Sequence, residues 1–159
     1  MIRRKMGSTE SVMILEKIHN YCGYQERCIR DVEEKLKDWT VQKKRIPGII
    51  NQLQKEGFLN EERFAKAFAS GKFRLNKWGR LKIGFELKIK GIPELMILEG
   101  LASIDEKEYH KVLEELILRK QKELKPEKDL IIRDKILNFV LGKGYEMNLI
   151  LDLMKNLKI

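Results

Sequence analysis

Apolar residues recur at intervals of three and four along most of the chain, which is the period of an α-helix with one buried face. Glycine, proline and capping residues interrupt the pattern and divide it into successive segments. The first helix is expected to be capped by Ser8 or Thr9, and the second to begin near Tyr24. The third is expected over about 41–56, and Pro47 inside it also allows a later start, with proline in the first turn.

Further helix starts follow at residues that favour them. These residues are Asn60, Pro93, Asp105, Pro126 and Glu146. The segment 81–90 alternates apolar and polar residues, which is typical of a half-buried strand. Because no second strand is available to pair with it, a helix is the better prediction. As a helix it carries two apolar stripes, one formed by Leu81, Phe85 and Ile89 and the other by Ile83 and Leu87.

The helical pattern recurs along the chain. Ile46, Ile92 and Tyr145 occupy similar places before or at a helix start, at spacings of 46 and 53 residues. This period predicts an all-α fold of three tandem three-helix repeats, helix-turn-helix-like, that form an elongated curved array. The expected units are 1–59 with a basic N-terminal tail, 60–104 with a basic patch, and 105–159.

Positive charge is concentrated in the middle of the chain. The whole sequence has a net charge of +9, and residues 60–92 contribute nine basic and three acidic side chains. Residues 105–159 are close to neutral, with twelve basic and eleven acidic side chains. A locally cationic segment predicts a binding surface for nucleic acid or for an acidic partner protein.

The sequence contains no recognisable catalytic, metal or cofactor site. Cys22 and Cys28 are too few for a disulfide framework, and their spacing matches no common zinc motif. No candidate nucleophile, metal cluster or phosphate loop is evident, so neither catalysis nor a cofactor is expected. No apolar signal core or membrane-spanning run is found, so a soluble cytoplasmic protein is expected.

Two separated motifs give a more specific indication. GFLNEERFA is followed by GRLKIGFELKIKGI, and together they resemble the RecX family of recombination regulators. The matching positions are Gly57, Phe58, Leu59, Arg63, Phe64, Ala65, Gly79, Ile83, Glu86, Leu87, Lys90, Gly91 and Ile92. Many members of that family have proline where this chain has Arg80. The close match covers about a quarter of the chain.

The resemblance implies a non-enzymatic regulator. Such a protein would bind the RecA recombinase, chiefly as its filament on single-stranded DNA, and inhibit filament extension, strand exchange and ATP hydrolysis. Direct DNA binding is then expected to be weak, and a monomer is sufficient. The alternative, which the charge supports without any family, is a sequence-independent nucleic-acid-binding helical repeat.

The candidate residues fall into two groups. The motif residues Gly57, Phe58, Arg63, Phe64, Ala65, Gly79, Ile83, Glu86, Leu87, Gly91 and Ile92 are expected to be mainly structural. The predicted contact set is Lys66, Lys72, Phe73, Arg74, Lys77, Arg80, Lys82, Lys88 and Lys90. Phe73 is placed on an outward stripe opposite Phe64 and Phe68, and the alternative is that it packs against the next repeat. Trp78 either closes a helix corner or stacks on a partner.

Overall fold

The computed structural model describes residues 2–159, and side chains from Thr9 onward, and every regular element in this part is helical. The first three helices are α1 (Ile2–Tyr24), α2 (Ile29–Asp38) and α3 (Ile46–Lys55), with a short 3-10 turn at Lys43–Arg45. The next three are α4 (Glu61–Asn76), α5 (Arg80–Ile89) and α6 (Glu94–Ala102). The last three are α7 (Glu106–Leu124), α8 (Asp129–Gly142) and α9 (Met147–Asn156).

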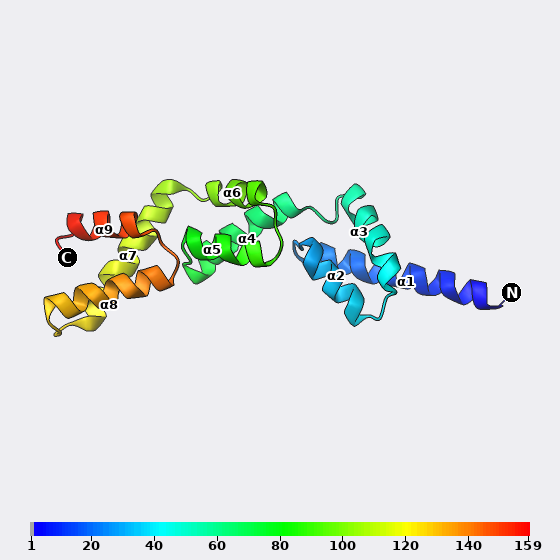
Figure 1. Cartoon of the computed structure of the whole chain (residues 1–159), viewed down its shortest axis with the longest axis horizontal. Coiled ribbons are helices and arrows are strands. Elements are labelled where there is room, and N and C mark those ends of the chain that lie inside the picture. Colours follow the sequence, from blue (N-terminus) through cyan, green and yellow to red (C-terminus); the bar gives the residue numbers. More distant parts are fainter. Residues whose placement is uncertain (1) are drawn as a thin grey trace.

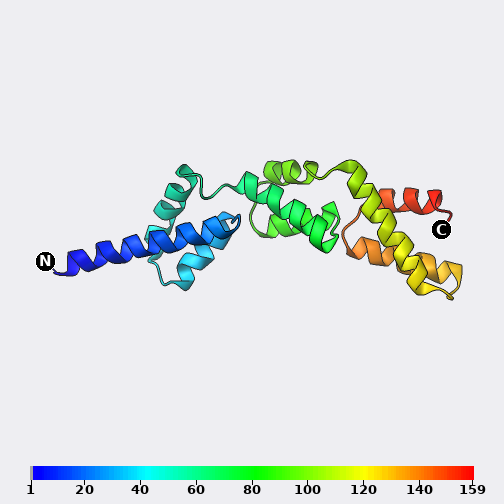
Figure 2. The same cartoon turned by 180° about the vertical axis from the view of Figure 1, so that it is seen from behind.

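These helices form three groups that lie in a row, with the chain termini at opposite ends (Figure 1). Figure 2 shows the same order from behind. We call α1–α3 unit 1, α4–α6 unit 2 and α7–α9 unit 3. The all-helical, elongated arrangement of three three-helix repeats confirms the predicted fold class. The residue limits proposed for the units stay a prediction.

Several helix starts differ from the sequence prediction. Ser8 and Thr9 lie inside α1, which begins at Ile2, so the cap predicted there is wrong. The second helix begins at Ile29 rather than near Tyr24. Cys28 caps it, because its Sγ accepts a hydrogen bond from the Asp31 amide at 3.4 Å while the Asp31 carboxylate accepts one from the Cys28 amide at 3.2 Å.

The predicted starts of α3 and α4 are confirmed, and that of α8 is wrong. α3 begins at Ile46 with Pro47 in its first turn, the later of the two predicted starts. The Asn60 cap of α4 is confirmed, because Asn60 Oδ1 accepts a hydrogen bond from the Arg63 amide at 2.9 Å. α8 begins at Asp129, not at Pro126.

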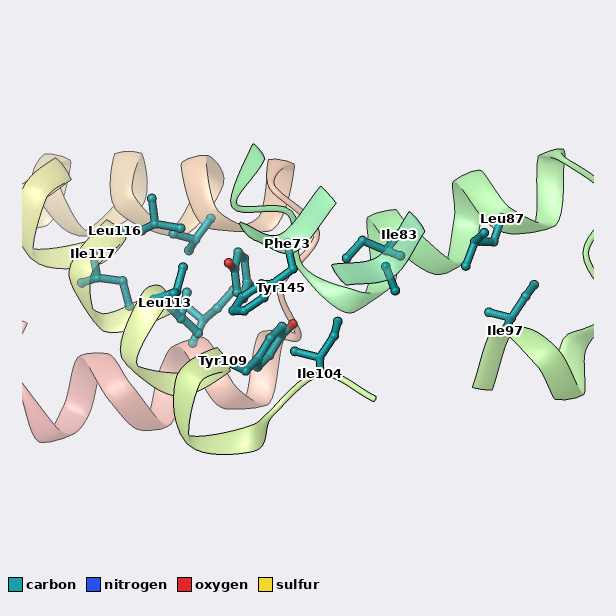
Figure 3. Close-up of a cluster of buried hydrophobic side chains, with 14 of the residues drawn as sticks. Phe73, Ile83, Leu87, Ile97, Ile104, Tyr109, Leu113, Leu116, Ile117 and Tyr145 are labelled. Carbon is teal, nitrogen blue, oxygen red and sulfur yellow. The ribbon is translucent and has the colours of Figure 1, made fainter. Parts of the chain in front are cut away.

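The buried side chains form two hydrophobic cores rather than three. The core of unit 1 is built from α1, α2 and α3 and the segments that follow them. It includes Ile18, Val32, Leu36, Leu53 and Leu59. Units 2 and 3 share the second core, which runs from Phe64 to Met154 and includes Ile83, Leu87, Tyr109 and Tyr145 (Figure 3). Cys28 belongs to this second core although it lies in unit 1.

Backbone groups make the junction between units 2 and 3. The Gly79 amide donates a hydrogen bond to the Lys143 carbonyl at 2.8 Å, and the Leu81 amide donates one to the Gly144 carbonyl at 2.9 Å. The two chains approach so closely that a Cβ added at Gly79 would overlap the Gly144 carbonyl group. A Cβ at Gly144, whose φ is +96°, would overlap that of Lys82. Only glycine fits at these two positions.

Two buried tyrosines complete this junction. The Tyr109 hydroxyl accepts a hydrogen bond from the Arg80 amide at 3.0 Å and donates one to Glu146 Oε2 at 2.6 Å. The Tyr145 hydroxyl donates to the Lys77 carbonyl at 2.9 Å. Burial raises the pKa of both tyrosines above the usual range, and for Tyr109 the bond to Glu146 adds to the effect. Both hydroxyls therefore keep their protons, and their hydrogen bonds, at neutral pH.

Side chains make the junction between units 1 and 2. Arg63 Nε donates to Glu26 Oε1 at 2.5 Å, and Lys90 Nζ lies 3.2 Å from Asp31 Oδ1. Arg30 donates to the Ile89 carbonyl. Apart from the buried Cys28, these contacts are polar, and the pairs are partly exposed to solvent. The Arg63 pairing agrees with the structural role predicted for this residue.

The motif residues otherwise behave as structural positions. Six of them are buried, namely Phe64, Ala65, Gly79, Ile83, Leu87 and Ile92. Gly57 and Gly91 both have positive φ values, +76° and +78°, which favour glycine after a helix end. Phe58 is 39% exposed and packs against His19, with ring centroids 4.5 Å apart and the ring planes tilted by 48°.

Candidate binding surface

The loop between α4 and α5 is the centre of the basic surface. Lys77 ends α4 in the left-handed conformation, with φ of 58°, and the Trp78 amide donates to the Lys72 carbonyl at 3.2 Å. Because the Lys77 carbonyl also accepts the Tyr145 hydroxyl, unit 3 holds this loop in place. The loop is therefore a fixed part of the junction between units 2 and 3.

Four lysines lie in this loop or beside it, and we call them the lysine cluster: Lys72, Lys77, Lys82 and Lys143. Two of them, Lys72 and Lys82, place their ammonium groups 4.9 and 4.5 Å from the ring centroid of Trp78. Lys143 Nζ donates to the Asn76 carbonyl at 3.2 Å. Within residues 9–159 none of the four lysines forms an ion pair with a carboxylate. Their charge is uncompensated and can attract an anionic ligand.

Trp78 has the corner-closing role that was one of the two sequence interpretations. Its side chain is half-buried and packs against the core shared by units 2 and 3. The lysine ammonium groups lie over its ring at cation–π distance. The indole therefore positions the two lysines close together.

The sequence interpretation missed Lys143. It lies in the nearly neutral final third of the chain, where an average over many residues hides a single well-placed cation. The contact between Gly144 and Lys82 brings it beside the basic segment of unit 2. Lys143 also lies over the Phe139 ring with Lys120, at 5.8 and 4.9 Å. The positive surface therefore continues from unit 2 into unit 3.

The outward position predicted for Phe73 is wrong. Its side chain is only 4% exposed and lies 5.7 Å from Tyr109, measured between ring centroids (Figure 3). The buried face of α4 is formed by Phe64, Ala65, Ala69 and Phe73. Leu75, two residues further along the same helix, is 84% exposed. Unit 3 packs against the end of α4 and covers Phe73, so the alternative interpretation holds.

Three of the predicted contact residues have partners inside the protein. Arg80 pairs with Glu106 and stacks on Tyr109, with the guanidinium carbon 3.9 Å from the ring centroid. The hydrogen bond from Arg80 lowers the pKa of Glu106. Lys90 pairs with Asp31 across the first junction, and Lys66 pairs with Glu62 at 3.2 Å within α4. These three charges are partly or wholly compensated.

The remaining predicted cations, Arg74 and Lys88, are exposed, and the structure gives them no ion pair in the part of the chain that it describes. Arg74 lies near the end of α4, and Lys88 lies on α5. Of the predicted contact set, Lys72, Lys77 and Lys82 therefore gather at one place, where Lys143 joins them.

Other kinds of site are not found in the described residues. No group of three or more His, Cys, Asp or Glu side chains there lies close enough together to hold a metal ion. Over the same residues, no helix is both long enough and apolar enough to cross a lipid bilayer.

Comparison with known proteins identifies the family of this chain. The family model described as the second three-helix domain of RecX matches residues 60–101, which contain all of unit 2 apart from the final residue of α6. A protein named regulatory protein RecX from Clostridium acetobutylicum is 31% identical over 132 residues. The chain belongs to the RecX family. A RecX regulatory protein from Streptococcus sanguinis is 26% identical over 125 residues.

The relatives are longer than this chain. The alignments cover 80% and 79% of it but only 61% of the Clostridium protein and 48% of the Streptococcus protein. A crystal structure of regulatory protein RecX covers 97% of the chain with a TM-score of 0.85 at 17% identity. The crystal structure of RecX from Lactobacillus salivarius covers 91% with a TM-score of 0.81 at 22% identity. These two structures support the fold.

Proposed function

We propose that this chain is a non-enzymatic regulator that binds the RecA recombinase on single-stranded DNA and restrains it. The expected consequences are slower filament extension, strand exchange and ATP hydrolysis. The observation that carries the proposal is the lysine cluster at the junction between units 2 and 3. Four lysines that form no ion pair within residues 9–159 lie together there, on an elongated protein of the RecX family.

The shape and the charge suit a nucleoprotein filament. An elongated array of repeats presents an extended surface that can follow the groove of a helical assembly. Phosphates of the enclosed DNA would attract the lysine cluster, and the bulk of the three units would obstruct the neighbouring protomers. Inhibition then requires only that the chain occupies the filament, and it needs no catalytic residue.

The test is RecA ATP hydrolysis on single-stranded DNA with substoichiometric amounts of this chain. We expect hydrolysis to fall progressively as the chain is added, because one bound molecule obstructs several protomers. An unchanged rate across the titration, with the chain shown to be folded by circular dichroism, would contradict the proposal.

A nucleic-acid-binding repeat is the second candidate, because the same cluster could bind phosphates without RecA. Affinity for bare single strands would then be high and would fall steeply with salt, by a factor set by the number of phosphates contacted. Filament regulation predicts instead weak binding to bare DNA and strong preference for RecA-coated DNA. Anisotropy measurements on both ligands over a salt series separate the two functions.

A further inference from the structure

One surface of unit 2 is neither core nor part of the lysine cluster. Leu81, Phe85 and Ile89 follow one another at steps of four residues along α5, and they are 59%, 62% and 50% exposed. Ile83 and Leu87, on the opposite side of the same helix, are fully buried. The two apolar stripes expected from the sequence therefore exist, but only one of them is covered by the protein.

The exposed stripe continues onto α6. Leu98 is 56% exposed, and a hollow of about 270 Å³ lies between it and Phe85. The floor and edge of this hollow include Gly84, Ile97 and Lys88. We call Leu81, Phe85, Ile89 and Leu98 the apolar patch. A contiguous set of large exposed apolar side chains with a hollow between them is typical of a protein-binding surface.

We propose that the apolar patch docks on a protein surface of apolar side chains bordered by carboxylates, and that this surface belongs to the recombinase of the filament. The inference rests on the proposed function, because that function supplies the protein partner. Three of its four side chains are aliphatic and gain nothing from contact with phosphates, so a protein surface suits the patch better than DNA does. The patch would bind the protein of the filament while the lysine cluster binds near its DNA.

Charge complementarity favours a different, acidic protein over a second copy of this chain. Lys82 and Lys88 lie on α5 at the two edges of its exposed stripe, and neither forms an ion pair within residues 9–159. Residues 60–104 carry nine basic and five acidic side chains, so two copies docked through this patch would bring like-charged units together. Carboxylates on the partner would instead meet Lys88, which is exposed and lies outside the lysine cluster.

The test compares two pairs of exposed apolar residues. The double variant Leu81→Ser/Phe85→Ser removes part of the patch. The matched control Leu130→Ser/Ile131→Ser changes two exposed residues of α8, which are 73% and 44% exposed. Affinity for preformed RecA–DNA filaments is expected to fall about tenfold or more for the patch variant and to stay within about twofold for the control. Affinity for bare single-stranded DNA should be unchanged in both.

Each outcome decides the question. Filament binding by the patch variant equal to that of the wild type would overturn the inference while leaving the proposed function intact. Failure of the wild type to bind filaments would overturn both. A wild-type dimer in sedimentation that the patch variant dissociates would assign the patch to a second copy, and this also overturns the inference. If the double variant is unfolded by circular dichroism, the single variant Leu98→Ser provides the same comparison.

Discussion

The two junctions between units are built in different ways. Units 2 and 3 meet through backbone hydrogen bonds, two glycines in close contact and a shared hydrophobic core. Units 1 and 2 meet mainly through partly exposed ion pairs and a few hydrogen bonds. Backbone hydrogen bonds do not depend on side-chain rotamers and hold the two units in one arrangement. Exposed ion pairs are weak and are screened by salt. We therefore expect units 2 and 3 to act as one rigid body and unit 1 to move relative to them.

The difference bears on function because the lysine cluster lies at the rigid junction. Lys72 and Lys82 come from unit 2 and Lys143 from unit 3, so their spacing depends on the contact of Gly79 with Gly144. A fixed spacing of charges lowers the entropy lost when a ligand binds. Movement at the other junction, if it occurs as we expect, would let unit 1 adapt to the bound surface.

The largest expected effect is on the rigid junction. Gly144→Ala adds a Cβ that overlaps Lys82 and forces a residue with a side chain to keep a φ of +96°. Strain and overpacking together should lower the free energy of unfolding by about 2–5 kcal/mol, measured by urea denaturation. Gly142→Ala is the matched control, because a Cβ there meets nothing within 4 Å. It should be neutral or stabilising, and equal effects of the two substitutions would contradict a tight backbone contact.

The next effect concerns the polar group within that junction. Tyr109→Phe removes the hydroxyl that accepts from the Arg80 amide and donates to Glu146. Leaving a buried amide without a partner should cost about 1–3 kcal/mol of unfolding free energy. Tyr24→Phe, at a position that is 84% exposed, should change it by no more than about 0.5 kcal/mol. A Tyr109 variant as stable as the control would show that water replaces the hydroxyl.

A smaller, pH-dependent effect is expected at the other junction. Burial raises the pKa of Asp31, but hydrogen bonds from Cys28 and the charge of Lys90 outweigh it and lower the pKa below its usual value. Asp31→Asn removes the negative charge from the capping-box partner of Cys28 and breaks the Lys90 ion pair, which should cost about 0.5–2 kcal/mol at neutral pH. Asp38→Asn, on the exposed end of the same helix, should be nearly neutral.

The sign of the pH dependence follows from the lowered pKa. The contribution of Asp31 is complete above the unfolded pKa of about 4, and it is lost as pH falls through the lower folded pKa. The difference between wild type and Asp31→Asn in urea denaturation should therefore shrink as the pH is lowered below about 4. A difference that stays constant from neutral to strongly acid pH would mean that the charge of Asp31 does not matter.

The smallest effect is the coupling between Arg63 and Glu26. Their side chains are 47% and 30% exposed, so a double-mutant cycle with alanine should give a coupling of about 0.2–1 kcal/mol. Adding salt to about 1 M should reduce it, because the Debye length falls to about 3 Å. A coupling of several kcal/mol that salt does not change would make this junction as firm as the other one.

Local patterns were enough to predict most helices and the motif positions. The helix over 81–90 followed from the lack of a second strand, and it is the observed α5. The motif residues Phe64, Leu87 and Ile92 were expected to be structural, and all three are buried. Capping rules located α4 correctly but not α2, because cysteine is a rare cap and Cys28 was assigned to the helix itself.

What the sequence could not predict depends on contacts between units. Phe73 is buried by Tyr109 of unit 3, and nothing within α4 indicates that another unit covers its end. Lys143 joins the basic surface only because Gly144 contacts Lys82. From the sequence, Arg80 is one more surface cation, whereas in the structure it contacts Glu106 and Tyr109 of unit 3. Residues that act across a junction require the tertiary structure.

The most direct test of the central claim measures filament binding by two triple variants. Lys72→Glu/Lys82→Glu/Lys143→Glu reverses three charges of the lysine cluster. Lys122→Glu/Lys128→Glu/Lys155→Glu makes the same change in net charge at exposed lysines elsewhere in unit 3. Binding of each labelled protein to preformed RecA–DNA filaments is followed by fluorescence anisotropy. We expect a large loss of affinity for the first variant and a small loss for the second. Equal affinities of the two variants would contradict this claim.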